Sequence, residues 1–227
     1  MEIHKPKPSH NWREFLTEIG TIVIGILIAL SLEQTVEALH ERHLAHEAND
    51  AINAEIRVDL GRIATHLAMQ TCNERRLDEI ADLLRDWKSG KEPPAGLTIG
   101  DPGDEPLVDQ RWQANLNNGR FSQQSPAEQA QQAAFYTQIS ILNVILDREH
   151  GSWSQLRALE LGPGVLSTDM RPGLVAALAS AQTNARDLRL LSQYVLKNAE
   201  STFGATKATL NPDVLGGSCR PMRAATG

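Results

Sequence analysis

The most constraining feature of this 227-residue chain is one apolar run close to the N-terminus. Residues 19–32 read IGTIVIGILIALSL, which is 14 residues without a charge. As a helix this run rises only about 21 Å, whereas the hydrocarbon core of a bilayer is about 30 Å thick. A membrane helix must therefore include its neighbours. We predict a span over residues 15–36, in which Glu18 and Glu33 lie near the two interfaces, where a carboxylate can reach water.

Two other interpretations of the run remain open. A cleaved signal peptide also has a basic start and a short apolar core, and Ala29-Leu30-Ser31 has the small residues of a cleavage site. A buried core helix of a soluble protein is the third interpretation. We favour an uncleaved anchor, because the segment before the run mixes acidic with basic residues. The helical pattern also continues through residues 30–43 without Gly or Pro.

Basic residues near the span predict its orientation. Lys5, Lys7 and Arg13 precede it, whereas Arg42 is the one Lys or Arg among residues 33–50. Because basic residues stay on the cytoplasmic side, we expect residues 1–14 in the cytoplasm and residues 37–203 in the periplasm of a bacterium. The protein would then lie in the inner membrane. With about 18 residues before the apolar run, we expect no cytoplasmic output domain.

Small residues within the span suggest a contact with another helix. Thr21, Gly25 and Ala29 fall four apart on one helix face, and such rows let membrane helices approach closely. The alternative is that Gly and Ala are simply common in membrane helices. The partners expected from the sequence are therefore the lipid bilayer and either a protein partner or a homo-oligomer.

Composition predicts an all-α fold and argues against nucleic acid as a partner. The chain has 22 Lys+Arg and 28 Asp+Glu; the first 18 residues hold three of each, which leaves 19 against 25. This mildly acidic remainder lacks the basic surface that nucleic acid requires. Aromatic residues make up only 4% of the chain, which favours helices over strands.

Apolar spacing and turn residues divide the chain into helices. We expect the membrane helix to continue into a long stalk helix, with a kink near Gly61 or residues 71–73, that packs with two or three further helices in an antiparallel bundle outside the membrane. A loop is expected over residues 89–106, and an extended or disordered tail over 204–227. The apolar positions of the stalk are Ile52, Ile56, Leu60, Ile63, Leu67, Leu77, Ile80, Leu84 and Trp87.

The three remaining helices have local signals. A short one is expected within residues 107–121, a third begins at the capping box Ser125-Pro126-Ala127-Glu128, and a fourth covers about 171–202. Two cysteines, Cys72 and Cys219, would form a disulfide in an oxidising periplasm and tie the tail to the stalk. The alternative is two unrelated thiols.

Few residue patterns point to chemistry. His40, His43 and His46 stand in a string that is not HExxH, so a solvated face is favoured over a metal site or a pH-responsive collar. Asp109, Arg111 and Trp112 follow the long loop and could form a pocket, although a packed Trp is favoured. The sequence lacks GxSxG and a Gly-rich phosphate loop. We therefore expect no enzyme, no cofactor and no metal.

The N-terminal stretch resembles the opening of a family of small, mostly proteobacterial membrane proteins with one N-terminal membrane helix and no known activity. The matching pieces are HKPKP, WREFL and GILIAL, all within residues 2–46. The resemblance implies a membrane anchor and adds no catalytic residue. We expect a membrane-anchored periplasmic helical protein that acts through protein contacts, as an accessory subunit, scaffold or adaptor. The alternative is a ligand-sensing domain that signals through a partner.

Overall fold

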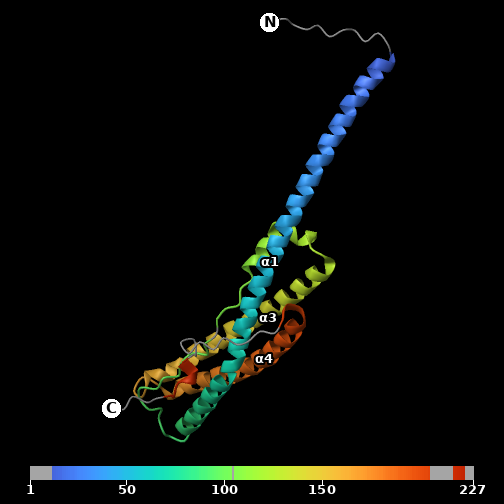
Figure 1. Ribbon diagram of the computed structural model, residues 1–227. Coiled ribbons are helices and arrows are strands. Elements are labelled where there is room, and N and C mark those ends of the chain that lie inside the picture. The colour runs from blue at the N-terminus through green and yellow to red at the C-terminus, as the bar shows by residue number, and fades with distance from the viewer. Residues whose placement is uncertain (1–11, 104, 205–216, 223–227) are drawn as a thin grey trace. The chain divides into compact units, whose positions relative to one another are not determined.

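The structure is a computed structural model that describes residues 12–103, 105–204 and 217–222. Within these residues every regular element is a helix, which confirms the all-α prediction (Figure 1). The α-helices are α1 (Trp12–Lys88), α2 (Gln110–Asn117), α3 (Pro126–Leu156) and α4 (Arg171–Phe203). Short 3-10 helices, η1 to η4, cover Arg120–Gln123, Arg157–Leu161, Thr168–Met170 and Gly217–Cys219.

The chain divides into two compact units, residues 1–48 and 49–227, and α1 contributes to both. In the first unit the apolar side chains of α1 are exposed; Ile24, for example, is 59% accessible. This is the one helix among the described residues that is long and apolar enough to cross a membrane. Trp12 lies at the start of α1 and contacts Phe15, with ring centroids 5.9 Å apart.

The hydroxyl groups of this apolar segment are all bonded within the helix. Thr17, Thr21, Ser31 and Thr35 are its four Ser and Thr residues. Each Oγ donates to the backbone carbonyl four residues earlier, at 2.7 to 2.8 Å. A polar group without a partner is costly in hydrocarbon, so these bonds allow the segment to lie in a bilayer.

In the second unit α1 is the element around which the others pack. It is continuous through Gly61 and residues 71–73, where the sequence had suggested a kink. Most of the predicted apolar stripe is fully buried, from Ile52 to Trp87. Leu67 is the exception: it is half-buried, and the neighbouring His66 occupies the core position.

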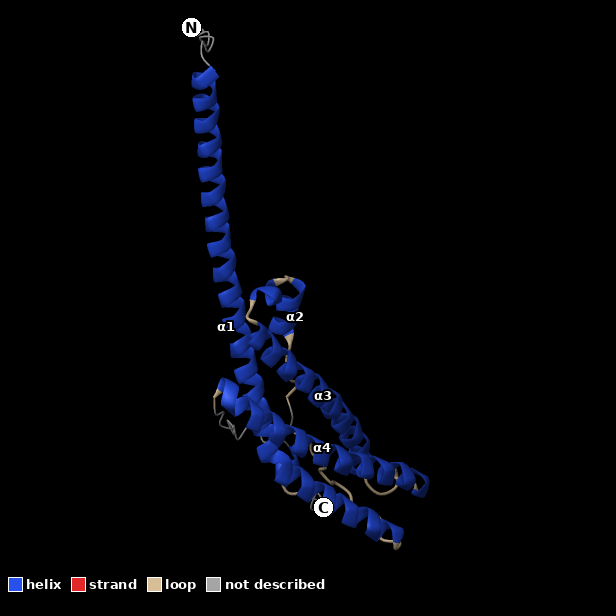
Figure 2. Ribbon diagram, turned by 90° about the vertical axis from the view of Figure 1, so that its right-hand side faces the viewer, coloured by secondary structure: helices blue, strands red, loops and turns tan. Residues whose placement is uncertain are grey.

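Helices α3 and α4 lie side by side (Figure 2), and the colour gradient of Figure 1 shows that they run antiparallel. The ring of Phe135, near the start of α3, lies 5.9 Å from that of Phe203 at the end of α4. The predicted capping box is present, because Glu128 N donates to Ser125 Oγ and Ser125 N donates to the Glu128 carboxylate. Helix α2 ends before Gly119, whose φ of 69° is left-handed as expected for a C-terminal cap.

The interior has two apolar clusters separated by a polar layer. The first joins the stripe Ile52–Ile63 to α2, the first half of α3 and the end of α4. The second joins Leu77–Trp87 to the end of α3 and the start of α4. Many of the buried residues between them are polar: His66, Gln70, Asn73 and Arg76 of α1, Glu149 and Ser152 of α3, and Asn184 of α4. The buried Met69 of α1 lies in the same stretch.

The end of the chain is attached to α1. Cys72 and Cys219 form a disulfide, with their Cα atoms 4.8 Å apart, which confirms the predicted pair. Residues 217–219 form the 3-10 helix η4, and Ser218 is fully buried. This part of the tail therefore differs from the expected extended or disordered segment; residues 205–216 and 223–227 lie outside the described residues.

Candidate functional site

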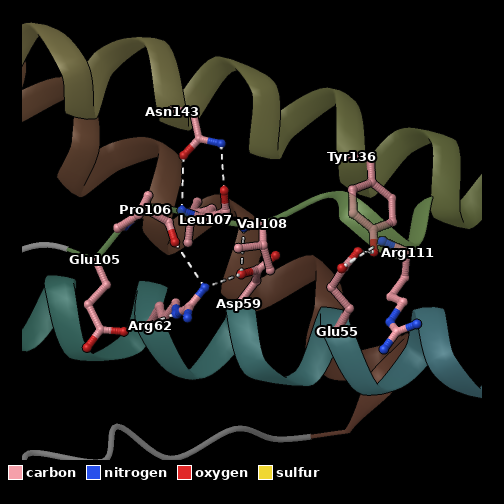
Figure 3. Close-up of polar contacts among 10 residues, drawn as sticks. All are labelled: Glu55, Asp59, Arg62, Glu105, Pro106, Leu107, Val108, Arg111, Tyr136 and Asn143. Carbon is pink, nitrogen blue, oxygen red and sulfur yellow. Dashed lines mark hydrogen bonds and ion pairs between the residues drawn. The ribbon is translucent and has the colours of Figure 1, made fainter. Parts of the chain in front are cut away.

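Two buried carboxylates of α1 bind the segment that leads into α2 (Figure 3). Glu55 accepts a hydrogen bond from the backbone N–H of Arg111 at 2.9 Å and a longer one from Trp112 at 3.4 Å. These are N–H groups of the first turn of α2, which have no partner within their own helix. Glu55 thus caps α2 from another helix. The N-cap residue Asp109 does not fill this role, since it makes no side-chain cap bond.

Asp59 lies one turn further along α1 and binds the same segment. Its Oδ1 accepts the backbone N–H of Val108 at 3.1 Å. Arg62 lies 3.5 Å from the same oxygen, and its guanidinium also donates to the carbonyl of Pro106 at 3.0 Å and to Glu105 at 3.1 Å. Asp59 Oδ2 is buried without a hydrogen-bond partner among the described residues.

Helix α3 closes the other side of this segment. Asn143 binds both backbone groups of Leu107: Oδ1 accepts its N–H at 3.1 Å and Nδ2 donates to its carbonyl at 3.0 Å. Tyr136 donates its hydroxyl to Glu55 Oε1 at 2.7 Å. The segment 105–112 is therefore held by α1 on one side and α3 on the other, and we call this arrangement the acidic clamp.

Burial controls the protonation of the acidic clamp. It raises the pKa of Asp59 from 3.8 to about 6, an effect that the Val108 N–H and Arg62 reduce. Burial, followed by the hydrogen bond to Glu55, raises the pKa of Tyr136 well above its usual range, so its hydroxyl stays protonated and donates. The acidic clamp therefore contains one carboxylate that changes charge near pH 6.

Trp112 packs in the core beside the acidic clamp. Its ring stacks on Tyr136 at 4.9 Å and meets the edge of Phe121 at 4.9 Å. Of the three residues expected to form a pocket, Trp112 is thus a packed residue, Arg111 contributes its backbone N–H, and the side chain of Asp109 accepts a bond from Gln113. This geometry matches the packed-Trp alternative and brings the three residues to the acidic clamp.

The polar layer contains a second group of titratable residues. His66 Nε2 lies 3.7 Å from a carboxylate oxygen of Glu149 and 2.5 Å from Gln70 Nε2. Burial, with a smaller effect of the His150 charge, lowers the pKa of His66 from 6.5 to about 4. The ring is therefore neutral at pH 7, and its approach to Glu149 is a buried polar contact at that pH rather than an ion pair.

Arg76 is a buried basic residue, and it holds the tail. Its side chain is 1% accessible, and its guanidinium donates to the carbonyls of Thr98, Ile99 and Arg220. Its Nε also lies 2.9 Å from a carboxylate oxygen of Glu79, three residues along the same helix. Because these bonds accompany the disulfide, the loop and the tail are fixed to α1 at the same place.

The other predicted residues lie in the first unit. Thr21, Gly25 and Ala29 share one exposed face of α1, and a Cβ at Gly25 would meet no atom within 4 Å. Their pairing with another helix stays a prediction. Among the histidines, His43 lies 3.3 Å from Glu47 on the exposed surface.

Sequence reasoning missed Glu55, Asp59 and His66, although a signal was present. All three stand at positions of the apolar stripe, three or four residues from Ile52, Ile56 and Ile63. A charged residue on the buried face of a helix requires a partner from another element. That spacing could have identified the carboxylates, while the identity of their partners depends on the fold.

Comparison of the chain with protein-family models, with curated proteins and with solved structures finds no match.

Proposed function

We propose that this protein is anchored in the bacterial inner membrane by the apolar part of α1 and acts through protein contacts of a periplasmic helical domain. It would serve as an accessory subunit, scaffold or adaptor rather than as an enzyme. The observation that carries the anchor is the exposed apolar segment whose hydroxyls are all bonded within its own helix.

The disulfide supports the periplasmic location. Disulfides persist in oxidising compartments, which include the bacterial periplasm, and are rare in the cytosol. The Cys72–Cys219 bond belongs to the second unit, the one that the distribution of Lys and Arg assigns to the periplasm. Both arguments favour the same compartment and are independent of each other.

The roles of the buried charges support contact rather than catalysis. Glu55 and Asp59 accept backbone N–H groups, and Arg76 donates to backbone carbonyls. Side chains that bind the protein's own backbone in this way hold segments in place. The second unit is therefore well suited to present a rigid surface.

Alkaline extraction of native membranes tests the anchor. Ile24→Lys places a charge at the middle of the span, at a cost of about 3 kcal/mol, and is expected to move the protein into the soluble fraction. Val58→Lys is the matched control, because Val58 is 52% exposed in the second unit and Ile24 is 59% exposed. Equal extraction of wild type and Ile24→Lys would refute the anchor.

Native purification in mild detergent tests the contact function. The expected result is a stoichiometric companion identified by mass, whose own role would then indicate the process served.

Protease treatment of spheroplasts tests the compartment, since residues 49–227 should be cleaved from the outside. A domain that is protected until the cells are lysed would contradict the periplasmic assignment.

A further inference from the structure

The solvent-facing side of α3 lacks charge over residues 129–146. Residues 129–146 are 18 residues without an Asp, Glu, Lys or Arg. Several of them are nevertheless exposed, and Ile141 is 49% and Val144 47% accessible. A surface helix normally carries charged residues on its solvent side, and clustered exposed apolar residues mark interaction sites.

Helix α4 adds two exposed apolar residues to this surface, and the charged Asp187 and Lys197 are exposed one turn from them. Leu190 and Tyr194 stand one turn apart and are 59% and 55% exposed. Between the two helices lies an open hollow of about 230 Å³, lined on one side by residues of α3 that include Gln138 and on the other by residues of α4 that include Tyr194. We define the α3/α4 face by six residues: Ala134, Gln138, Ile141, Leu190, Tyr194 and Asn198.

The exposed apolar residues and the hollow form one surface. Gln138 and Tyr194 line the hollow from opposite helices. Ile141 lies one turn further along α3, and Leu190 lies one turn back along α4. Because the two helices are antiparallel, both steps lead in the same direction, so Ile141 and Leu190 flank the same end of the hollow.

Charge narrows the kind of partner that fits. None of the ten residues that line the hollow is charged. A charged partner surface would lose its hydration here without gaining an ion pair, which is unfavourable. The part of the partner that enters the hollow must therefore offer protruding apolar or neutral polar side chains.

The α3/α4 face itself meets this description. It carries both protruding apolar side chains, Ile141, Leu190 and Tyr194, and a hollow that can receive one. An 18-residue helix is about 27 Å long and two packed helices are about 19 Å wide, so the footprint is roughly 500 Å². This footprint is smaller than the about 800 Å² per partner of a standard interface, so the contact is a modest one.

We infer that the α3/α4 face is the contact surface of a homodimer, in which the same face of two copies meets around a two-fold axis. This inference rests on the proposed contact function and specifies its first partner, a second copy of the chain. Anchoring both copies in one membrane raises their effective concentration, so a modest interface suffices.

Single-cysteine cross-linking of the full chain in lipid nanodiscs tests the surface. The two native cysteines are bonded to each other, so an introduced cysteine is the one reactive thiol. Ile141→Cys and Tyr194→Cys are expected to give a covalent dimer with a short bifunctional maleimide. Val175→Cys is the matched control, because Val175 is 49% exposed on α4 but about 22 Å along the helix from Leu190.

A charge substitution in the α3/α4 face tests how much this face contributes to the stability of the dimer. Leu190→Arg is expected to raise the dissociation constant of the dimer about tenfold or more, and Val175→Arg to leave it unchanged. Both sites are exposed, so the fold should survive; far-ultraviolet circular dichroism and the intact disulfide verify it.

A wild-type chain that is monomeric overturns the inference. So does a dimer that Leu190→Arg leaves intact, because the contact then lies elsewhere, for example between the membrane helices. Failure here is distinguishable from failure of the proposed function. A monomer that purifies with a companion of different sequence would refute the homodimer and support the adaptor role. A dimer that alkaline extraction releases from the membranes would support the homodimer and refute the proposed anchor.

Discussion

Replacing Asp59 by Asn is expected to remove a pH-dependent destabilisation of the folded protein. Burial raises the pKa of Asp59 from 3.8 to about 6, so the folded state binds this proton more tightly than the unfolded chain does. The ionised carboxylate therefore costs stability relative to its protonated form. At 1.36 kcal/mol for each pKa unit, the difference between the two values corresponds to about 3 kcal/mol.

The sign of the effect defines the pH window. The contribution of Asp59 to the free energy of unfolding is greatest below about pH 4, falls as the pH rises to about 6, and is constant above that. Asn cannot ionise and its carbonyl oxygen can still accept the Val108 N–H. We therefore expect Asp59→Asn to match wild type near pH 4 and to be up to about 3 kcal/mol more stable near pH 7.5.

Urea unfolding of the full chain in mild detergent, followed by tryptophan fluorescence, measures this difference at about pH 4, 5, 6 and 7.5. Trp112 and Trp153 are buried in the second unit and report its unfolding. Asp109→Asn is the control, because Asp109 is an exposed carboxylate next to the same segment. The reasoning is refuted if the difference between wild type and Asp59→Asn does not change with pH, or if the variant is several kcal/mol less stable near pH 7.5.

Three further predictions concern single contacts. Tyr136→Phe removes the hydroxyl that donates to Glu55 and should lower the free energy of unfolding by about 1–2 kcal/mol, seen as a lower urea midpoint; an unchanged midpoint would contradict it. Reduction of the disulfide, which joins residues 147 apart, should cost about 4–5 kcal/mol in the chain-entropy model, measured in the same way, and a loss below about 1 kcal/mol would count against it. Gly100→Ala places a Cβ against the backbone of Gly217 and should make the disulfide react faster with reductant. Gly90→Ala is the control, since its φ of 100° gives similar strain with no atom near the new Cβ, and equal reduction rates in the two variants would disprove the contact.

The elements that depend on local signals could be predicted from the sequence. The capping box Ser125–Glu128 starts α3 because its two bonds join residues three apart. The apolar stripe of α1 follows from a period of 3.6 residues, and the disulfide from the presence of a single pair of cysteines. None of these inferences requires knowledge of which elements meet.

The acidic clamp depends on long-range contacts and could not be predicted in the same way. Glu55 and Asp59 bind backbone groups about 50 residues away, and a backbone N–H leaves no signature in the sequence. The spacing of Arg76 and Glu79, three residues apart, indicates an ion pair on the surface of the helix, and the structure contains this pair. The burial of Arg76 follows from the loop and the tail that cover it, which only the fold brings together.

His66 should show the opposite pH dependence to Asp59, two turns away on α1. Burial, and then the charge of His150, lower the pKa of His66 from 6.5 to about 4. The unfolded chain therefore binds this proton more tightly, and the contribution of His66 rises by up to about 3 kcal/mol as the pH increases from about 4 to 6.5. Over the same window the contribution of Asp59 falls by a similar amount.

The two buried groups should consequently offset each other, so that their combined contribution is nearly independent of pH between about 4 and 6. In each single variant, the free energy of unfolding should change with pH in the direction set by the buried group that remains. The stability of Asp59→Asn should rise with pH through this window, whereas that of His66→Gln should fall. The double variant should be flat again, offset from wild type by a constant, because residues separated by two turns with no shared partner combine additively. Slopes of the same sign in the two single variants would show that at least one of these groups keeps its ordinary pKa in the folded protein.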